Sequence, residues 1–173
     1  MGEAQRNLEL KVRAADLDAL LDRTLALGAR DEGASRDIDT YFAAPSGRLK
    51  LRQTEGVSGG TLVAYRRADE PGSRYSHYRL VEVADAPALL AALTETLGVR
   101  VVVVKQRHVL IYGATRIHLD RVDGLGSFVE LETVLAGQAE AEATAEHELV
   151  KRALGLEDAE PVVSSYGDLA ART

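Results

Sequence analysis

The sequence predicts a mainly β (α+β) protein: a closed eight-stranded antiparallel barrel with helices packed on its outside. About eight stretches alternate apolar and polar residues, as strands do. Turn signals rich in glycine separate several of them, among them APSG at 44–47 and DGLGS at 123–127. Only three stretches have a helical period. Many strands separated by glycine-rich turns predict an antiparallel sheet that closes on itself.

Each element can be placed by its periodicity and its end signals. The expected strands lie at 6–13, 35–43, 47–53, 61–67, 74–83, 100–111, 115–122 and 127–135. The expected helices lie at 14–29, 86–98 and 138–155, each with a glycine at or near its end. Their apolar stripes are expected to cover the barrel from outside. No linker or repeat interrupts the chain, so we expect a single domain over 1–173.

Composition narrows the class of protein. The 173 residues carry a formal net charge of −6, which argues against a broad nucleic-acid or membrane surface. The absence of cysteine excludes disulfides, thiolate metal sites and cysteine nucleophiles. We find no apolar leader, and the longest apolar run, VRVVVVK, is too short to span a bilayer, so we expect a cytoplasmic protein.

Charged residues share one face of several strands. In RLKLR, Arg48, Lys50 and Arg52 point to one face, and Leu49 and Leu51 point to the other. Polar faces recur on five more strands, through Asn7, Glu9, Lys11 and Arg13; Arg74, Ser76 and Tyr78; Lys105 and Arg107; Arg116, His118 and Asp120; and Glu130 and Glu132. One such strand is typical of a solvated sheet face. Six of them favour a barrel with a charged lumen.

The signs of these charges indicate a ligand. Cations gather on some strands and carboxylates on others, and we expect unbound rows of like charge to repel one another. Several lysines and arginines together bind phosphate oxygens, and clustered carboxylates hold Mg²⁺ or Mn²⁺. The pattern therefore predicts a tunnel for a triphosphate and a divalent cation.

An ordered set of motifs, which begins with NLELK at 7–11 and ends with SSYGDL at 164–169, resembles the CYTH superfamily, the triphosphate tunnel metalloenzymes. NLELK at 7–11 is similar to the ExExK signature of that family, and SSYGDL at 164–169 to its closing SYxDLL segment. Between them follow, in the family's order, DTYF, GRLKLR, YRR, RYSHY, VKQR and RIHLDRVDGLGSFVELE. The resemblance covers essentially the whole chain. It implies an eight-stranded antiparallel tunnel, a homodimer, and an activity of the class IV adenylate cyclase or triphosphatase kind.

The resemblance also implies roles for individual residues. The implied metal ligands, for Mg²⁺ or Mn²⁺, are Glu9, Glu130 and Glu132. The residues taken as catalytic are Lys11, Arg107 and Asp120, of which Asp120 is also a candidate metal carboxylate. The residues taken to bind the substrate are Arg48, Lys50, Arg52, Arg67, Arg74, Lys105, Arg116 and His118. The alternation does not decide whether Arg66 or Arg67 faces the tunnel.

Two departures from the family pattern bear on the activity. Asn7 stands where the signature has its first glutamate, so the number of metal ions stays open. Ser76 and Tyr78 stand where many triphosphatases carry two glutamates, and the motif style is closer to the class IV cyclase-like branch. A cyclase that converts ATP to cyclic AMP and pyrophosphate is therefore favoured. The alternatives are a tripolyphosphate or thiamine triphosphate hydrolase and a non-catalytic binder of polyphosphate or nucleotide.

Other polar residues have simpler interpretations. His118 is expected to form hydrogen bonds in the tunnel and less readily to act as a general base. His77 and His108 fall outside the polar rows and are expected at the surface or in packing. His147, on the polar C-terminal helix, is expected to be solvated. Tyr41 and Tyr78 either contact a base or pack at the rim.

Overall fold

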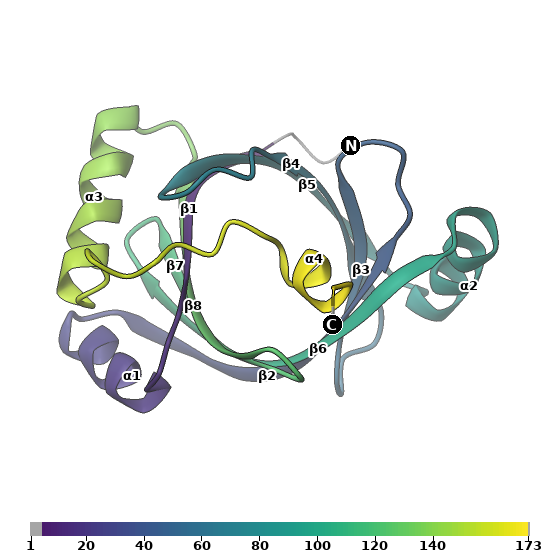
Figure 1. Ribbon diagram of the computed structural model, residues 1–173, viewed down its shortest axis with the longest axis horizontal. Coiled ribbons are helices and arrows are strands. Elements are labelled where there is room, and N and C mark those ends of the chain that lie inside the picture. The colour runs from purple at the N-terminus through teal and green to yellow at the C-terminus, as the bar shows by residue number, and fades with distance from the viewer. Residues whose placement is uncertain (1–4, 173) are drawn as a thin grey trace.

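The computed structural model describes residues 5–172 and is built around a closed barrel (Figure 1). The antiparallel strands follow one another around the barrel in the order β1-β5-β4-β3-β2-β6-β7-β8. Strand β1 closes the ring, because it pairs with β5 on one side and with β8 on the other. The predicted fold class is confirmed.

The elements follow the alternating and helical stretches of the sequence. The strands are β1 Gln5–Arg13, β2 Arg30–Phe42, β3 Arg48–Thr54, β4 Gly60–Arg67, β5 Arg74–Val83, β6 Val99–Tyr112, β7 Thr115–Val122 and β8 Gly126–Leu135. The helices are α1 Leu17–Ala26, α2 Ala86–Leu97, α3 Glu140–Ala153 and α4 Tyr166–Ala170. Among the strands, β2 departs most from expectation, since it begins at Arg30 and not at residue 35. A register shift between Asp31 and Gly33 lets this additional polar segment pair with β6.

The main apolar core lies outside the barrel wall. Outward residues of β1, β7 and β8, such as Leu10, Ile117 and Leu131, form a buried cluster with Leu20 of α1 and Val150 of α3. Figure 1 shows α1 and α3 together on one side of the barrel and α2 on the opposite side. The helices thus cover the apolar faces of the strands and leave the interior to their polar faces.

A fourth helix, α4, was not predicted, and it covers an opening of the barrel instead of its outer wall. The chain after α3 crosses this opening, and α4 lies over it (Figure 1). Ser165 begins the helix with a capping box, in which its side chain accepts a hydrogen bond from the Asp168 backbone N–H. Tyr166 packs against inward residues of the barrel, and its ring centroid lies 5.0 Å from that of Phe128. An apolar cluster therefore fills this end of the barrel.

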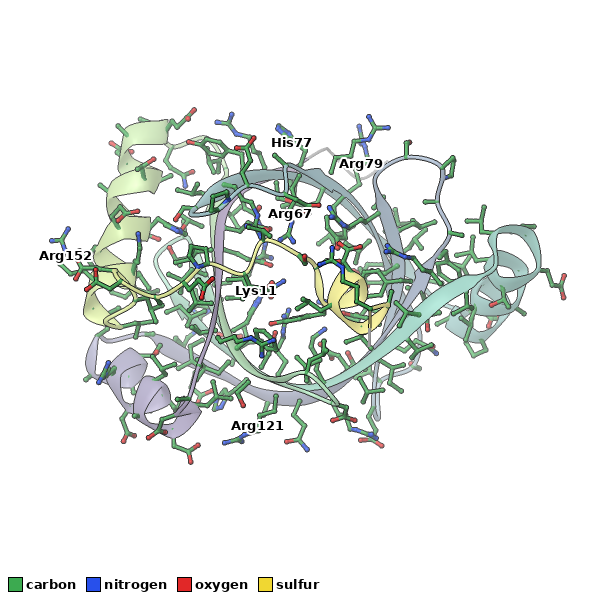
Figure 2. The ribbon with its side chains drawn as sticks, in the orientation of Figure 1. Lys11, Arg67, His77, Arg79, Arg121 and Arg152 are labelled. Atoms are coloured by element: carbon green, nitrogen blue, oxygen red, sulfur yellow. The ribbon has the colours of Figure 1, made fainter. Side chains whose placement is uncertain are left out.

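The expectation that His147 is solvated is wrong. Its side chain is fully buried between α3 and the barrel, where Nδ1 lies 2.9 Å from Thr133 Oγ1 and Nε2 lies 2.9 Å from Ser73 Oγ. Burial lowers the pKa of the His147 imidazole to about 4, so the ring is neutral near pH 7. His77, in contrast, is exposed on the outer surface (Figure 2). Among the described helices, none has the length and apolar character needed to cross a membrane.

Leu51 tests the direction of the β3 side chains. It is fully buried outside the barrel, in a cluster with Phe42 and with Ala86 of α2. Leu51→Ala is expected to lower the free energy of unfolding by roughly 2–5 kcal/mol, because it opens a cavity under α2. Denaturant unfolding measures this loss. The control is Leu149→Ala on α3, where the leucine is 43% exposed, and a comparable loss there would contradict the assignment.

Candidate functional site

The barrel interior encloses a cavity of about 330 Å³. Its wall combines cations, carboxylates, tyrosines and a few apolar residues from β1 to β8 and from the C-terminal segment. The predicted site residues that line it are Glu9, Lys11, Lys50, Arg52, Arg67, Arg107, Arg116, His118, Glu130 and Glu132. Figure 2 shows Lys11 and Arg67 inside the ring of strands, and His77, Arg79, Arg121 and Arg152 outside it.

Strand register places residues of opposite charge side by side on neighbouring strands. Arg52 of β3 lies opposite Asp39 of β2, and Arg107 of β6 lies opposite Asp120 of β7. In the same way Glu130 of β8 lies opposite Lys11 of β1. The expected repulsion between unbound tunnel cations is therefore largely absent, because a neighbouring strand supplies the counter-charge.

Asp39 is the centre of the first charge cluster. It is fully buried, and it accepts hydrogen bonds from Lys50 Nζ at 2.8 Å, Lys105 Nζ at 2.5 Å and Arg52 Nε at 2.8 Å. Burial alone would raise the pKa of Asp39, but the three cations outweigh it and hold the pKa well below its usual range. The carboxylate therefore keeps its charge inside the wall.

Lys50 and Lys105 both have lowered pKa values in this crowded cluster. Burial, together with the charge of Arg52, lowers the pKa of Lys50 to about 7, although Asp39 acts in the opposite direction. The pKa of Lys105 is also lowered, again by burial first and by Arg52 second. Lys105 is fully buried and does not line the cavity, so its contact is with Asp39.

A second charge cluster surrounds Arg107. Its guanidinium donates to Asp120 Oδ1 at 2.7 Å and to Glu130 Oε2 at 2.8 Å. Asp120 also accepts a hydrogen bond of 2.9 Å from the Tyr166 hydroxyl of α4. Asp120 is fully buried behind Arg107 and does not line the cavity. Its contacts are those of a residue that orients Arg107.

Lys11 connects this cluster to the C-terminal segment. Its Nζ lies 3.0 Å from Glu130 Oε1, 4.0 Å from the centroid of the Tyr166 ring, and 3.4 Å from the backbone oxygen of Ser164. The charges of Lys11 and Arg107 help to hold the pKa of Glu130 well below its usual range, although burial alone would raise it. Glu130 is therefore an ionised carboxylate beside the cavity.

Glu9 has different partners from the other two predicted metal ligands. Its carboxylate is ion-paired with Arg67, and Arg74 Nε lies 3.5 Å away. Burial raises the pKa of Glu9, because the charge of Arg67 only partly offsets desolvation. Within residues 5–172, the compact group that could hold a metal ion consists of His118, Glu130 and Glu132. Their ligand atoms lie within 4.8 Å of one another.

Arg48 lies at the mouth of the barrel and not along the central cavity. Its guanidinium lies 2.7 Å from Asp69 Oδ2 and 2.9 Å from Asp168 Oδ2, and it lines a separate hollow of about 420 Å³. Arg67 reaches both spaces. Arg66 donates to Ser46 at an exposed position, so the alternative that the sequence left open is decided in favour of Arg67.

Arg74 faces inward but is engaged elsewhere. Its guanidinium donates to the backbone oxygens of Glu70 at 2.9 Å and Val162 at 3.1 Å. Arg67 donates to the backbone oxygen of Val163 at 3.1 Å. Arg74 does not line the cavity, and it holds the C-terminal segment over the barrel opening instead.

Several residues at this site were missed by sequence reasoning. They are Asp37, Asp39, Tyr65, Ser165 and Tyr166. A signal for the two aspartates was present, since Ser35, Asp37, Asp39 and Tyr41 alternate with other residues along β2. Ser165 and Tyr166 belong to the SSYGDL motif, but the motif does not show that they line the cavity, because their place depends on how the C-terminal segment folds back.

The cavity has a less charged end. Val63 of β4 pairs with Leu80 of β5, and both line the cavity together with Val109 of β6. Along β4 and β5 these positions lie away from Arg67 and Arg74, which contact the C-terminal segment. This end therefore offers apolar contacts next to the charged middle.

Comparisons with known proteins agree with the barrel fold. A family model described as the CYTH domain matches residues 5–166. Among solved structures, the PH1012 protein of Pyrococcus horikoshii has a TM-score of 0.83 at 23% identity, covering 94% of this chain and 98% of that one. No curated protein matches significantly.

Two further solved structures are of proteins to which an activity is ascribed. A candidate adenylate cyclase of Vibrio parahaemolyticus has a TM-score of 0.76 at 19% identity, covering 96% of this chain and 98% of that one. The adenylyl cyclase candidate HpAC1 of Hippeastrum, described as having a dominant triphosphatase activity, has a TM-score of 0.61 at 15% identity, covering 96% and 95%. At these identities the likeness shows a shared fold. Because the family model spans nearly the whole chain, this protein belongs to the CYTH domain family.

Proposed function

We propose that this protein is a metal-dependent enzyme that acts on a triphosphate inside the barrel, as a class IV adenylate cyclase does on ATP. The observation that carries the proposal is a cavity lined by cations, with a compact carboxylate group on one wall and an apolar end. Each part suits a different part of a nucleoside triphosphate.

The cations supply the phosphate site. The lysines and arginines that face the cavity are Lys11, Lys50, Arg52, Arg67, Arg107 and Arg116. Charge-assisted hydrogen bonds to phosphate are among the stronger polar contacts in proteins, and arginine offers two parallel donors. Asp39 and Asp120 lie behind this layer and hold Arg52 and Arg107 in place.

The carboxylate group is suited to a divalent cation. Glu130 and Glu132 face the cavity from alternate positions of β8, and their oxygens are close enough to His118 to share one ion. A bound Mg²⁺ or Mn²⁺ would neutralise charge on the phosphate oxygens. We therefore assign the metal site to this wall of the barrel.

The apolar end supports an organic substrate. Val63, Leu80 and Val109 offer nothing to a bare tripolyphosphate, but they can pack against a nucleoside. Tyr78 lines the same cavity, and its hydroxyl accepts a hydrogen bond of 3.0 Å from Arg116. A nucleoside triphosphate would use both ends of the space.

In the cyclase reaction, the ribose 3′-hydroxyl attacks the α-phosphorus and pyrophosphate leaves. Negative charge develops on the transferring group and on the leaving group, and Lys11 and Arg107 are positioned to stabilise it. Hydrolysis of the terminal phosphate would use the same cations with water as the nucleophile. The homodimer and the cytoplasmic location stay predictions, and sedimentation at micromolar concentration tests the first.

Product identification tests the proposed function. The protein is incubated with ATP, tripolyphosphate or thiamine triphosphate and with Mg²⁺ or Mn²⁺. Cyclic AMP with pyrophosphate is the expected outcome. Orthophosphate release would support the triphosphatase, and tight binding without turnover would support the non-catalytic binder.

Glu130→Gln is expected to abolish metal-dependent turnover, because it removes the charge and keeps the volume of a metal ligand. The control is Glu82→Gln, at an exposed position of β5. Full activity in the Glu130 variant, with a normal melting transition, would rule out the assignment.

Asp39→Asn is expected to destabilise the empty protein by about 3–5 kcal/mol, because three buried cations lose their shared counter-charge. Added tripolyphosphate should restore much of this loss, since it supplies the missing negative charge. The measurement is the melting temperature with and without tripolyphosphate. Asp31→Asn, at an exposed position of the same strand, is the control and should respond to tripolyphosphate as the wild type does.

Triphosphate affinity is expected to fall as the pH rises above 7. The pKa of Lys50 is about 7, so Lys50 is already charged below that pH. Above it, Lys50 must take up a proton before its charge can contribute to triphosphate binding. The loss attributable to Lys50 is at most about tenfold per pH unit. Lys50→Arg should flatten the profile, because arginine stays protonated. The measurement is the triphosphate affinity of both proteins by calorimetry at pH 6 to 8.5. Protonation of the ligand affects both proteins equally, so the difference between the two profiles reports on Lys50. Parallel profiles would disprove the role of Lys50.

A further inference from the structure

His118 is a buried tunnel residue with an unsatisfied nitrogen. Only 5% of its surface is exposed, and Nδ1 has no hydrogen-bond partner. A buried polar atom of this kind is costly unless something else occupies its lone pair or its proton. The residue sits on β7 opposite Glu130 of β8, so the barrel wall fixes its direction.

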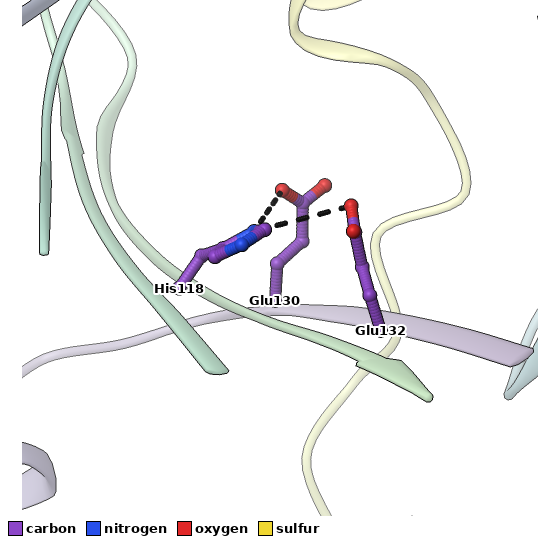
Figure 3. Close-up of side chains that lie close together, drawn as sticks. All are labelled: His118, Glu130 and Glu132. Atoms are coloured by element: carbon purple, nitrogen blue, oxygen red, sulfur yellow. Dashed lines mark ion pairs between the residues drawn. The ribbon is translucent and has the colours of Figure 1, made fainter. Parts of the chain in front are cut away.

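Nδ1 of His118 faces two carboxylates. It lies 3.8 Å from Glu130 Oε2 and 3.9 Å from Glu132 Oε1. Figure 3 marks both pairs with dashed lines. Both distances are within ion-pair range but too long for a hydrogen bond. Two ligands of one ion, each bound at about 2.1 Å, lie about 3–4 Å apart. The spacing thus suits a shared ion better than direct contact.

The two carboxylates do not need His118 as a counter-charge. Glu130 already has Lys11 at 3.0 Å and Arg107 at 2.8 Å, and Glu132 has Arg116 at 3.3 Å. A protonated imidazole would add a further positive charge beside these three cations. A neutral ring that offers its lone pair would not.

We propose that His118 is a nitrogen ligand of the tunnel metal, together with Glu130 and Glu132, and that this donor set favours Mn²⁺ over Mg²⁺. The inference rests on the metal site assigned under the proposed function. Mg²⁺ prefers oxygen ligands alone, whereas imidazole suits transition metals. Glu9, which the family resemblance implied as the third ligand, is instead held by Arg67 and Arg74.

Pulsed electron paramagnetic resonance on the whole protein with Mn²⁺ alone tests the proposal. The expected result is coupling of the manganese to one imidazole ¹⁴N, which changes to the ¹⁵N pattern when histidine is labelled with ¹⁵N. His118→Gln should abolish the coupling and weaken Mn²⁺ binding by roughly tenfold or more, with little change for Mg²⁺. His77→Gln, which alters an exposed histidine on β5, is the matched control and should retain both coupling and affinity.

Bound Mn²⁺ without a coupled histidine nitrogen would overturn the inference, and so would failure of Mn²⁺ to bind. The labelled wild-type protein decides the question even if His118→Gln does not fold. Because no substrate is present, the two proposals can fail separately. A coupled nitrogen in a protein without turnover would contradict the function, and turnover without a coupled nitrogen would contradict the ligand.

Discussion

The pairing of charges across neighbouring strands is the interaction on which the rest of this structure depends. A charged group inside a protein is strongly unfavourable unless it is paired and hydrogen-bonded. Here the register of the closed barrel sets Arg52 against Asp39 and Arg107 against Asp120. A shift of one residue in either pair would turn these side chains to the apolar outer face. The register that closes the barrel therefore also pairs the charges that are buried in its lumen.

This arrangement reverses the usual place of the apolar core. Leu10, Ile117 and Leu131 pack outward under α1 and α3, and Leu51 packs outward under α2. The helices thus stabilise the barrel from outside and leave the interior free for chemistry. Inside the barrel, an apolar cluster lies under α4, where Tyr166 meets Phe128.

The sequence predicted the fold because alternation is a local property. The pattern of RLKLR, repeated on other strands, is enough to separate the inner from the outer face. The partners across strands are not local, and this is why Asp39 was overlooked as the shared counter-charge of Lys50, Arg52 and Lys105. The burial of His147 was missed for the same reason, since it follows from where α3 docks.

Whether a residue given a role by resemblance lines the cavity depends on its depth in the barrel. Lys11, Arg107 and Glu130, for example, do line the cavity. Arg48 lies at the mouth, and Lys105 and Asp120 lie behind the lining residues. Alternation fixes the face of a strand but not the depth at which a side chain ends, because depth depends on strand tilt and on neighbouring side chains.

The remaining charge bears on the proposed binding of a triphosphate by an acidic protein. The inward cations Lys11, Lys50, Arg52, Arg67, Arg74, Lys105, Arg107 and Arg116 outnumber the inward carboxylates Glu9, Asp37, Asp39, Asp120, Glu130 and Glu132. The backbone oxygens of Val162, Val163 and Ser164 satisfy some of the surplus cations without adding negative charge. With Lys50 and Lys105 protonated, the lumen carries a net positive charge, although the chain as a whole carries −6. A polyanion that enters such a space gains from a field concentrated by the low-dielectric wall, and it need not compete with further carboxylates for these cations.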